Sequence, residues 1–351
     1  MTVIPGLILA LALAMLGQYS SVYVGEDLMG MPKSPVSPIM MAIILGIVVR
    51  NVTSLPVWVD PGIQFGLQQV LRIGIVLLGI RLSLGEVGEI GLKSLPIIIG
   101  TVAAALLIVT WLSRRIGLTG RLGTLIAVGT SICGATAIVA TAPTIGARDN
   151  ETSYAVACIT LFGVAAMLAY PLIGHLLFDG DPFLIGLFLG TSVHETAQVA
   201  GAGLVYQQIH DAPQALDAAT VTKLVRNLSM LLVIPLMAVM YHRKHAEGSE
   251  APAWWTMIPL FIVGFALMSL LRTLGDLGDK PLGVLNPDQW RWFVDHVKEL
   301  AELCLAVAMA AVGLGTRLRD LTAIGFTPLG VGLVSALLVG GVSALLIFLM
   351  F

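Results

Sequence analysis

Segments of mostly apolar residues recur along the whole chain, and this pattern limits its possible folds more than any other feature. A transmembrane helix needs about 20 consecutive, predominantly apolar residues. Candidate segments lie near residues 3–19, 36–50, 64–82, 94–113, 121–147, 151–178, 183–207, 216–241, 255–272, 296–316 and 324–350. The stretches between them are short, so no soluble domain is expected. The pattern predicts an all-α polytopic membrane protein with about 9–11 membrane segments.

The composition excludes most classes of soluble protein. Of the 351 residues, 57% are hydrophobic and 11% are charged, whereas a soluble globular domain carries about 25% charged residues. The balance of 19 basic and 21 acidic residues gives no reason to expect nucleic acid as a partner. The three cysteines fit neither a metal-ligand spacing nor a disulfide framework. We therefore expect a lipid bilayer around the chain, with no metal and no cofactor.

Two pairs of similar segments indicate an internal duplication. The sequence GTSICGATAIV at residues 129–139 aligns with GTSVHETAQVA at residues 190–200. A second pair aligns GIRL at residues 79–82 with GTRL at residues 315–318. We interpret these matches as two copies of one membrane module.

The two copies, about residues 36–178 and 183–351 of a single transmembrane domain at residues 1–351, are expected to have opposite orientations. Arg148 and the acidic loop at residues 178–182 favour two re-entrant hairpins that enter from opposite faces and meet near the midplane, because basic residues collect on the cytoplasmic side. A pair of broken helices that cross the membrane is the alternative. Inverted repeats with discontinuous helices at the midplane are typical of secondary transporters.

The start of each GTS segment predicts an interruption in a helix. A break strands backbone N–H and C=O groups, which lipid cannot satisfy. We expect Ser131 and Ser192 to cap the half-helices that follow, whose positive ends would then face an anion near the midplane. The other candidate substrate contacts in these segments are Thr130, Cys133, Gly134, Thr191 and Gln198.

His194 and Glu195 lie at the second predicted interruption. Ionisable residues inside the membrane are costly and are therefore candidates for function, and histidine changes its charge near neutral pH. In a structural alternative, Ser192 and Glu195 form an S-x-x-E capping box and His194 is a packing residue. The two interpretations are compatible. We expect His194 and Glu195 to carry a coupling proton.

A second polar group follows in the predicted span near residues 216–241. Lys223, Arg226 and Asn227 share one helix face, at positions i, i+3 and i+4. Lys223 lies deep enough in the span to disfavour the alternative in which these side chains reach the membrane surface. The two cations need an internal partner, either Glu195 or a bound oxyanion, which suits the fork of donors on arginine.

Taken in order, the motifs GTSICGATAIVA, GTSVHETAQVAGAG and TKLVRN resemble the YeiH-like family of bacterial inner-membrane proteins, which are named as sulfate exporters. The resemblance covers residues 30–351. It implies a fold like that of sodium/proton antiporters and bile-acid-type symporters, with inverted repeats and crossed broken helices, in the bacterial plasma membrane. The sulfate assignment is itself an inference within that family. The motif positions of the family fall on Ser131, Cys133, Gly134, His194, Glu195, Gln198, Lys223 and Arg226.

We hypothesise a secondary active transporter of a small anion, of the sulfate, sulfite or organosulfonate class, coupled to protons. A sodium-coupled carrier of another small organic anion is the first alternative, because broken-helix carbonyls and hydroxyl groups are sodium ligands. An anion channel and an intramembrane enzyme using His194, Glu195 and Cys133 are further alternatives, although we expect no enzymatic activity. A homodimer is expected only by analogy with similar folds.

Overall fold

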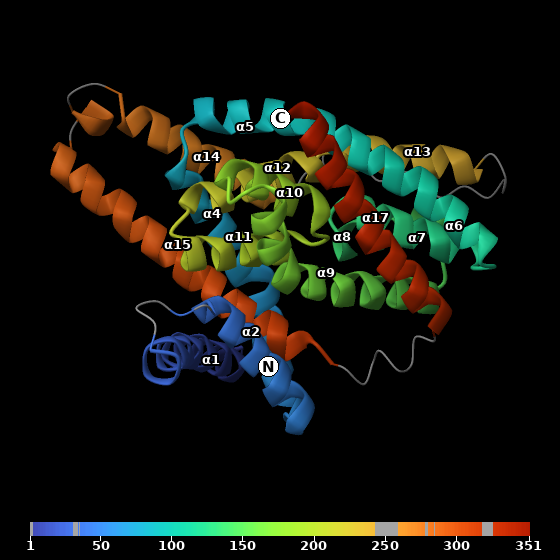
Figure 1. The fold of residues 1–351 in the computed structure, drawn as a ribbon, viewed down its shortest axis with the longest axis horizontal. Helices are drawn as coiled ribbons and strands as arrows, with labels where there is room; N and C mark the ends of the chain where they lie inside the picture. The colour runs from blue at the N-terminus through green and yellow to red at the C-terminus, as the bar shows by residue number, and fades with distance from the viewer. Residues whose placement is uncertain are drawn as a thin grey trace. The chain divides into compact units, whose positions relative to one another are not determined.

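The computed structural model describes residues 3–30, 34, 36–242, 259–277, 280–283, 285–317 and 326–351. Every regular element among them is helical, and none of these residues forms a strand (Figure 1). The first elements are α1 (Ile4–Val22), η1 (Tyr23–Leu28), α2 (Pro38–Val52), η2 (Val57–Val59), α3 (Asp60–Phe65), η3 (Gly66–Val70), α4 (Leu71–Leu78), η4 (Gly79–Arg81), α5 (Leu84–Ala104), η5 (Ala105–Val109) and α6 (Thr110–Arg115).

The later elements include both GTS segments. They are α7 (Gly120–Ser131), α8 (Ala135–Thr141), η6 (Pro143–Ile145), α9 (Asp149–Leu177), α10 (Pro182–Ser192), α11 (Thr196–His210), α12 (Pro213–Asn227), α13 (Met230–His242), α14 (Leu260–Gly275), η8 (Pro281–Gly283), α15 (Pro287–Gly315) and α17 (Phe326–Met350). Each predicted segment overlaps at least one of the described helices. Residues 255–258 and 324–325 of the predicted spans, and Leu318 of the GTRL motif, lie outside the described residues.

Six of the described helical segments are long and apolar enough to cross a membrane. They are Ile4–Val22, Val57–Arg81, Leu84–Arg115, Asp149–Leu177, Pro213–Tyr241 and Leu329–Met350. Shorter apolar helices include the interrupted segments that contain α8 and α10. The predicted class, an all-α polytopic membrane protein, is confirmed. The inverted orientation of the two copies stays a prediction.

The chain divides into two compact units that are each assembled from separate parts of the sequence. Unit 1 comprises Met1–Ile90, Gly203–Asp217 and Pro259–Arg317, and unit 2 comprises Gly91–Ala202, Ala218–Ile258 and Leu318–Phe351. Each unit therefore takes segments from both halves of the chain and is not one of the predicted sequence repeats. That the repeats form a single transmembrane domain stays a prediction.

In unit 1, α1, α2 and α15 pack together around small and branched apolar side chains (Figure 1). Glycines bring α2 and α15 into backbone contact. A Cβ atom built on Gly46 would lie 2.8 Å from the Ala310 carbonyl oxygen, and one built on Gly313 would lie 2.3 Å from the Ile43 carbonyl oxygen. Small residues permit this close approach between membrane helices, where packing rather than the hydrophobic effect favours association.

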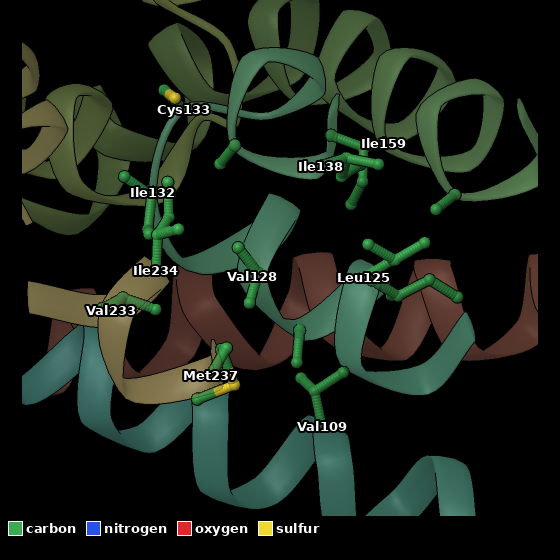
Figure 2. Close-up of a cluster of buried hydrophobic side chains, with 14 of the residues drawn as sticks. Val109, Leu125, Val128, Ile132, Cys133, Ile138, Ile159, Val233, Ile234 and Met237 are labelled. Carbon is green, nitrogen blue, oxygen red and sulfur yellow. The ribbon is translucent and has the colours of Figure 1, made fainter. Parts of the chain in front are cut away.

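In unit 2, a core of buried apolar side chains surrounds the interruption between α7 and α8. Figure 2 shows Ile132 and Cys133, which lie between these two helices, among side chains from α7, α8, α9 and α13. Ile132 is 0% exposed and Cys133 is 6% exposed. The interruption is thus enclosed by protein, which is the condition under which non-helical backbone is tolerated at membrane depth.

The long helix α9 is also fixed against α17. The Tyr170 hydroxyl donates a hydrogen bond to the Ala336 carbonyl oxygen at 3.1 Å. A Cβ atom on Gly340 would lie 2.6 Å from the same hydroxyl, so glycine at this position makes room for the tyrosine. This packing holds the helix that supplies Thr160 to the site described below.

We expect Gly313→Ala to lower the thermal unfolding temperature of the detergent-solubilised protein, because the new Cβ meets the Ile43 carbonyl oxygen at 2.3 Å. Overpacking of a tight contact costs about 1–3 kcal/mol. Gly88→Ala in α5 is the matched control, since a Cβ atom there has no neighbour within 4 Å and alanine favours the helix by roughly 0.5–1 kcal/mol. An unfolding temperature for Gly313→Ala as high as that of the control would contradict the packing.

Candidate functional site

Every residue predicted for the site lies in unit 2, at or beside two helix interruptions or near the end of α12. Three residues separate α7 from α8, and three separate α10 from α11. A helix that ends leaves its last four carbonyl groups without intrahelical partners. At membrane depth these groups need partners from the protein itself. The partners of the carbonyl groups at the ends of α7 and α10 therefore define the structure of the site.

Backbone N–H groups satisfy two of the carbonyl groups at the end of α7 and one at the end of α10. At the end of α7, the Ile132 N–H donates to the Val128 carbonyl at 3.1 Å and the Gly134 N–H donates to the Gly129 carbonyl at 3.0 Å. At the end of α10, the Val193 N–H donates to the Leu189 carbonyl at 3.1 Å. The Thr130, Ser131 and Ile132 carbonyl groups in the first segment, and those of Thr191, Val193 and His194 in the second, accept from two side chains of α12.

The Arg226 guanidinium connects the two interruptions. Its Nε donates to the Ser131 carbonyl oxygen at 2.8 Å, and Nη2 donates to the Thr130 carbonyl oxygen. Its Nη1 donates to the carbonyl oxygens of Thr191 at 2.7 Å and Val193 at 3.1 Å. The side chain is 0% exposed. One cation therefore caps the ends of α7 and α10 together, where the negative ends of the helix dipoles favour positive charge.

The Lys223 ammonium has the same role one turn earlier in α12. Its Nζ donates to the Ile132 carbonyl oxygen at 2.7 Å, to the Val193 carbonyl oxygen at 3.0 Å and to the His194 carbonyl oxygen. These bonds use all three donors of the ammonium group. We expected Glu195 or an anion as the internal partner of Lys223 and Arg226, and the structure instead gives both cations backbone carbonyl groups.

Ser131 and Ser192 do not cap the half-helices that follow, so this expectation is wrong. Each serine is the last residue of the preceding helix. The Ser131 hydroxyl donates to the Val128 carbonyl oxygen at 3.0 Å, and the Ser192 hydroxyl donates to the Phe188 carbonyl oxygen at 2.5 Å. The residue before α8 is Gly134, whose φ of 70° is a conformation that favours glycine.

The other predicted hydroxyl groups also bond to their own helices. Thr130 Oγ1 donates to the Ile126 carbonyl oxygen at 2.7 Å, and Thr191 Oγ1 donates to the Leu187 carbonyl oxygen at 2.7 Å. Thr130, Ser131 and Thr191 therefore contribute their backbone oxygens to the site, while the hydroxyl groups stabilise the final helical turns. Cys133 Sγ lies 3.3 Å from the Met230 sulfur within the apolar core.

Glu195 immediately precedes α11, and its carbonyl accepts from the Val199 N–H at 2.9 Å. Gln198 Oε1 accepts from the Glu195 backbone N–H at 3.1 Å. This bond is one half of a capping box between Glu195 and Gln198, whereas the Ser192 hydroxyl bonds to its own helix. The Glu195 carboxylate, on a half-buried side chain, accepts from the Thr160 hydroxyl at 2.9 Å. Gln198 Nε2 donates to the Thr160 carbonyl oxygen at 3.1 Å, so all three residues form one network.

Two glycines provide the space for this network. A Cβ atom on Gly163 would lie 1.9 Å from Gln198 Oε1, and one on Gly134 would lie 2.4 Å from Glu195 Cγ. Thr160 and Gly163 were not predicted as site residues. Their spacing of i and i+3 on one face of an apolar helix was the available signal, although small and hydroxyl residues are common in membrane helices for packing alone.

His194 and Asn227 contribute buried polar atoms that no hydrogen bond satisfies within the described part of the chain. The His194 side chain is 0% exposed, and neither ring nitrogen has a partner there. Asn227 Nδ2 donates to Thr196 Oγ1 at 3.1 Å, whereas its Oδ1 is likewise unsatisfied. An unsatisfied buried group costs about 1–3 kcal/mol, and a ligand or proton that reached these atoms would recover part of that energy.

Unit 1 contains a second polar cluster that was not predicted. Arg81 Nε donates to Asp217 Oδ1 at 2.7 Å, and Nη1 donates to Glu302 Oε1 at 3.1 Å. Gln207 accepts from Arg81 Nη2 at 3.1 Å and donates to Glu302 at 2.9 Å. Gln207 also lines a cavity of about 480 Å³, which is built from unit 1 residues only. Arg81 is more than a hundred positions from each of its partners in sequence, and no short motif joins them.

The helical fold, its six long apolar helices and its two enclosed interruptions define a multi-pass α-helical membrane protein. The chain belongs to the UPF0324 family of bacterial membrane proteins, because the family model described as Conserved hypothetical protein 698 matches residues 5–332. The resemblance to YeiH-like proteins is thereby confirmed.

Individual relatives match over most of their length. A UPF0324 membrane protein of Fusobacterium nucleatum is 34% identical over 304 residues, which cover 85% of each chain. One from Streptococcus agalactiae is 32% identical over 318 residues, or 91% of this chain and 89% of the relative. One from Streptococcus pyogenes is 35% identical over 322 residues, or 91% and 88%. The protein is accordingly a multi-pass protein of the bacterial plasma membrane.

We expect Arg226→Met to destabilise the protein strongly, because it leaves the Thr130, Ser131 and Thr191 carbonyl oxygens without their donor. At about 1–3 kcal/mol for each unsatisfied group, the unfolding temperature should fall by many degrees. The unfolding temperature of Arg226→Lys should fall less, because lysine keeps the positive charge although it lacks the fork of donors.

Arg291→Met is the matched control for this substitution. Arg291 pairs with Asp288 on an exposed helix surface, where substitutions usually change stability by about 0.5 kcal/mol or less. Thermal unfolding of the three purified variants in one detergent makes the comparison. Equal unfolding temperatures for Arg226→Met and Arg291→Met would show that the guanidinium does not hold the interruptions together.

Proposed function

We propose that the protein is a secondary active transporter, which moves a small anion across the membrane and couples this movement to protons. The observation that carries the proposal is the pair of interrupted helices whose ends are joined by the fully buried side chains of Lys223 and Arg226. Discontinuous helices whose ends point at a buried site are the recurrent way in which secondary transporters bind substrate and coupling ions.

Electrostatics favours an anion as the substrate. Lys223 and Arg226 place two positive charges at the interruptions, and Glu195 supplies one negative charge to the network around Gly134. The positive end of the α11 dipole adds to this excess of positive potential. Because the ammonium donors of Lys223 are all used, its attraction for an anion acts through charge, and a direct hydrogen bond would come from a ring N–H of His194, whose two nitrogens have no partner in the described part of the chain. The sulfate, sulfite or organosulfonate class rests on the family resemblance.

Protonation of Glu195 provides a route to coupling. When the carboxylate gains a proton, the site loses its negative charge and its attraction for an anion increases. By reciprocity, a bound anion increases the affinity of Glu195 for a proton. The anion and the proton then move together, and His194 is the second candidate carrier because a histidine ring nitrogen can accept a proton. We propose no enzymatic activity, and a homodimer remains a prediction.

We expect one oxyanion of a panel of sulfate, sulfite and small organosulfonates to raise the unfolding temperature of the purified protein, more at pH 6 than at pH 8. A ligand at 100 times its Kd stabilises the folded state by about 2.7 kcal/mol. Sulfate also stabilises proteins non-specifically, so the criterion is saturation at matched ionic strength. Glu195→Gln resembles the protonated side chain and should bind the same anion equally at both pH values. A Glu195→Gln protein that kept the pH dependence would remove Glu195 from the coupling.

We also expect a pH gradient to drive accumulation of that anion in vesicles containing the wild-type protein, and expect Glu195→Gln to abolish the dependence on the gradient. Asp295→Asn is the matched control, since Asp295 is exposed and pairs with Lys298 at 3.4 Å. Uptake of labelled anion with and without a proton ionophore is the measurement. Gradient-driven accumulation by Glu195→Gln would contradict the proton role, and ionic current without accumulation would identify a channel.

A further inference from the structure

The carbonyl groups bound to Lys223 form a site that suits a monovalent cation. The Ile132, Val193 and His194 carbonyl oxygens all accept from one nitrogen atom, Nζ of Lys223. They come from both interruptions, so neither helix end alone builds the site. In transporters with broken helices, carbonyl oxygens at unwound backbone and at the C-terminal ends of half-helices coordinate the coupling cation. The same kind of oxygen cage therefore exists here, with an ammonium group inside it.

We propose that the ammonium group of Lys223 permanently occupies a monovalent-cation site. A free sodium ion is therefore not needed at this site and cannot bind there in the wild-type protein. The proposal deepens the proposed transport function and rests on it, because it removes sodium at this site as the coupling ion. Without the ammonium group, the three carbonyl oxygens would bind a small free cation instead.

The packing around α12 fixes the ammonium group in the cage. A Cβ atom on Gly190 would lie 2.6 Å from Thr222 Cβ and 2.8 Å from the Ala219 carbonyl oxygen, so the backbones of α10 and α12 are in direct contact. Lys223 follows Thr222 and is itself 0% exposed. Turning the side chain toward water would break its bonds to the Ile132, Val193 and His194 carbonyl oxygens. Unlike a free cation, the occupant is covalently attached and does not leave during a transport cycle.

Arg226 supports the same assignment from the adjacent carbonyl groups. Its donors take the Thr130 and Ser131 carbonyl oxygens on one side and the Thr191 carbonyl oxygen on the other. Those oxygens are therefore not available to enlarge the cage or to bind a second ion. Removal of Lys223 alone would leave the Ile132 and His194 carbonyl oxygens without this donor, while the Val193 carbonyl oxygen would keep its bond to Arg226 Nη1 at 3.1 Å. A substitution at Lys223 consequently tests one site, with the neighbouring contacts of Arg226 left in place.

The first experiment uses the wild-type protein in detergent and needs no knowledge of the substrate. Its thermal unfolding is measured in sodium chloride, potassium chloride and choline chloride at equal ionic strength. We expect the three unfolding temperatures to agree, because the cage already holds a cation. A saturable increase with sodium over choline would overturn the proposal and restore sodium as a candidate coupling ion.

The second experiment removes the ammonium group. Lys223→Ala in choline chloride should unfold at a lower temperature than wild type, and sodium or methylammonium should raise its unfolding temperature saturably, by an amount on the order of 5 °C at saturation. Lys223→Met is the matched control: it lacks the charge but fills the space, so we expect it to be destabilised without any response to these cations.

The outcomes for the variants separate this proposal from the transport function. The cation site is overturned if Lys223→Ala is folded and its unfolding temperature does not respond to sodium, potassium or methylammonium. It is also overturned if Lys223→Ala cannot be purified in a folded state with any of these cations. Recovery only in the presence of one of these cations supports it. Absence of anion transport by a wild-type protein whose stability ignores sodium would instead count against the transporter while leaving the cage as described.

Discussion

The arrangement of unit 2 depends on the need to satisfy backbone carbonyl groups where water does not reach. Two helices stop inside protein, and their last carbonyl oxygens form the negative ends of two helix dipoles. Lys223 and Arg226 resolve both problems with one device, since their N–H groups fill the hydrogen bonds and their charges oppose the dipoles. The buried cations are thus compensated by many carbonyl groups rather than by a single carboxylate. Glu195 is left free to titrate without dismantling the helix ends.

The chain's class and the locations of its helices were predictable because lipid imposes a length and a composition on every spanning segment. The GTS segments, which occur within otherwise apolar stretches, predicted an interruption near each of them, and the described helices α7 and α10 end at Ser131 and Ser192. Which of the two flanking helices each serine would stabilise could not be predicted. Serine is a good N-cap in water, but here its hydroxyl bonds back to its own helix, and the glycine or glutamate that follows precedes the next helix.

The partners of the charged residues could not be predicted for a different reason. A sequence shows which side chains are ionisable, and charge suggests an ionic partner, whereas carbonyl groups are present at every residue and leave no mark in the sequence. Thr160 and Gly163 were missed because each residue type is ordinary in a membrane helix. The Arg81 cluster in unit 1 was missed because Arg81, the segment with Gln207 and Asp217, and Glu302 are distant in sequence and meet only in the folded structure.

The guanidinium of Arg226 has a mechanical consequence. The guanidinium binds the ends of α7 and α10 at the same time. If one helix end moved away from the other, Arg226 would lose hydrogen bonds to carbonyl groups on one of them. The pair is therefore expected to travel as one stiff block during any change of conformation, with bending confined to other parts of the chain. In the transporter that we propose, a site built this way would keep its geometry while its exposure to either side of the membrane changes.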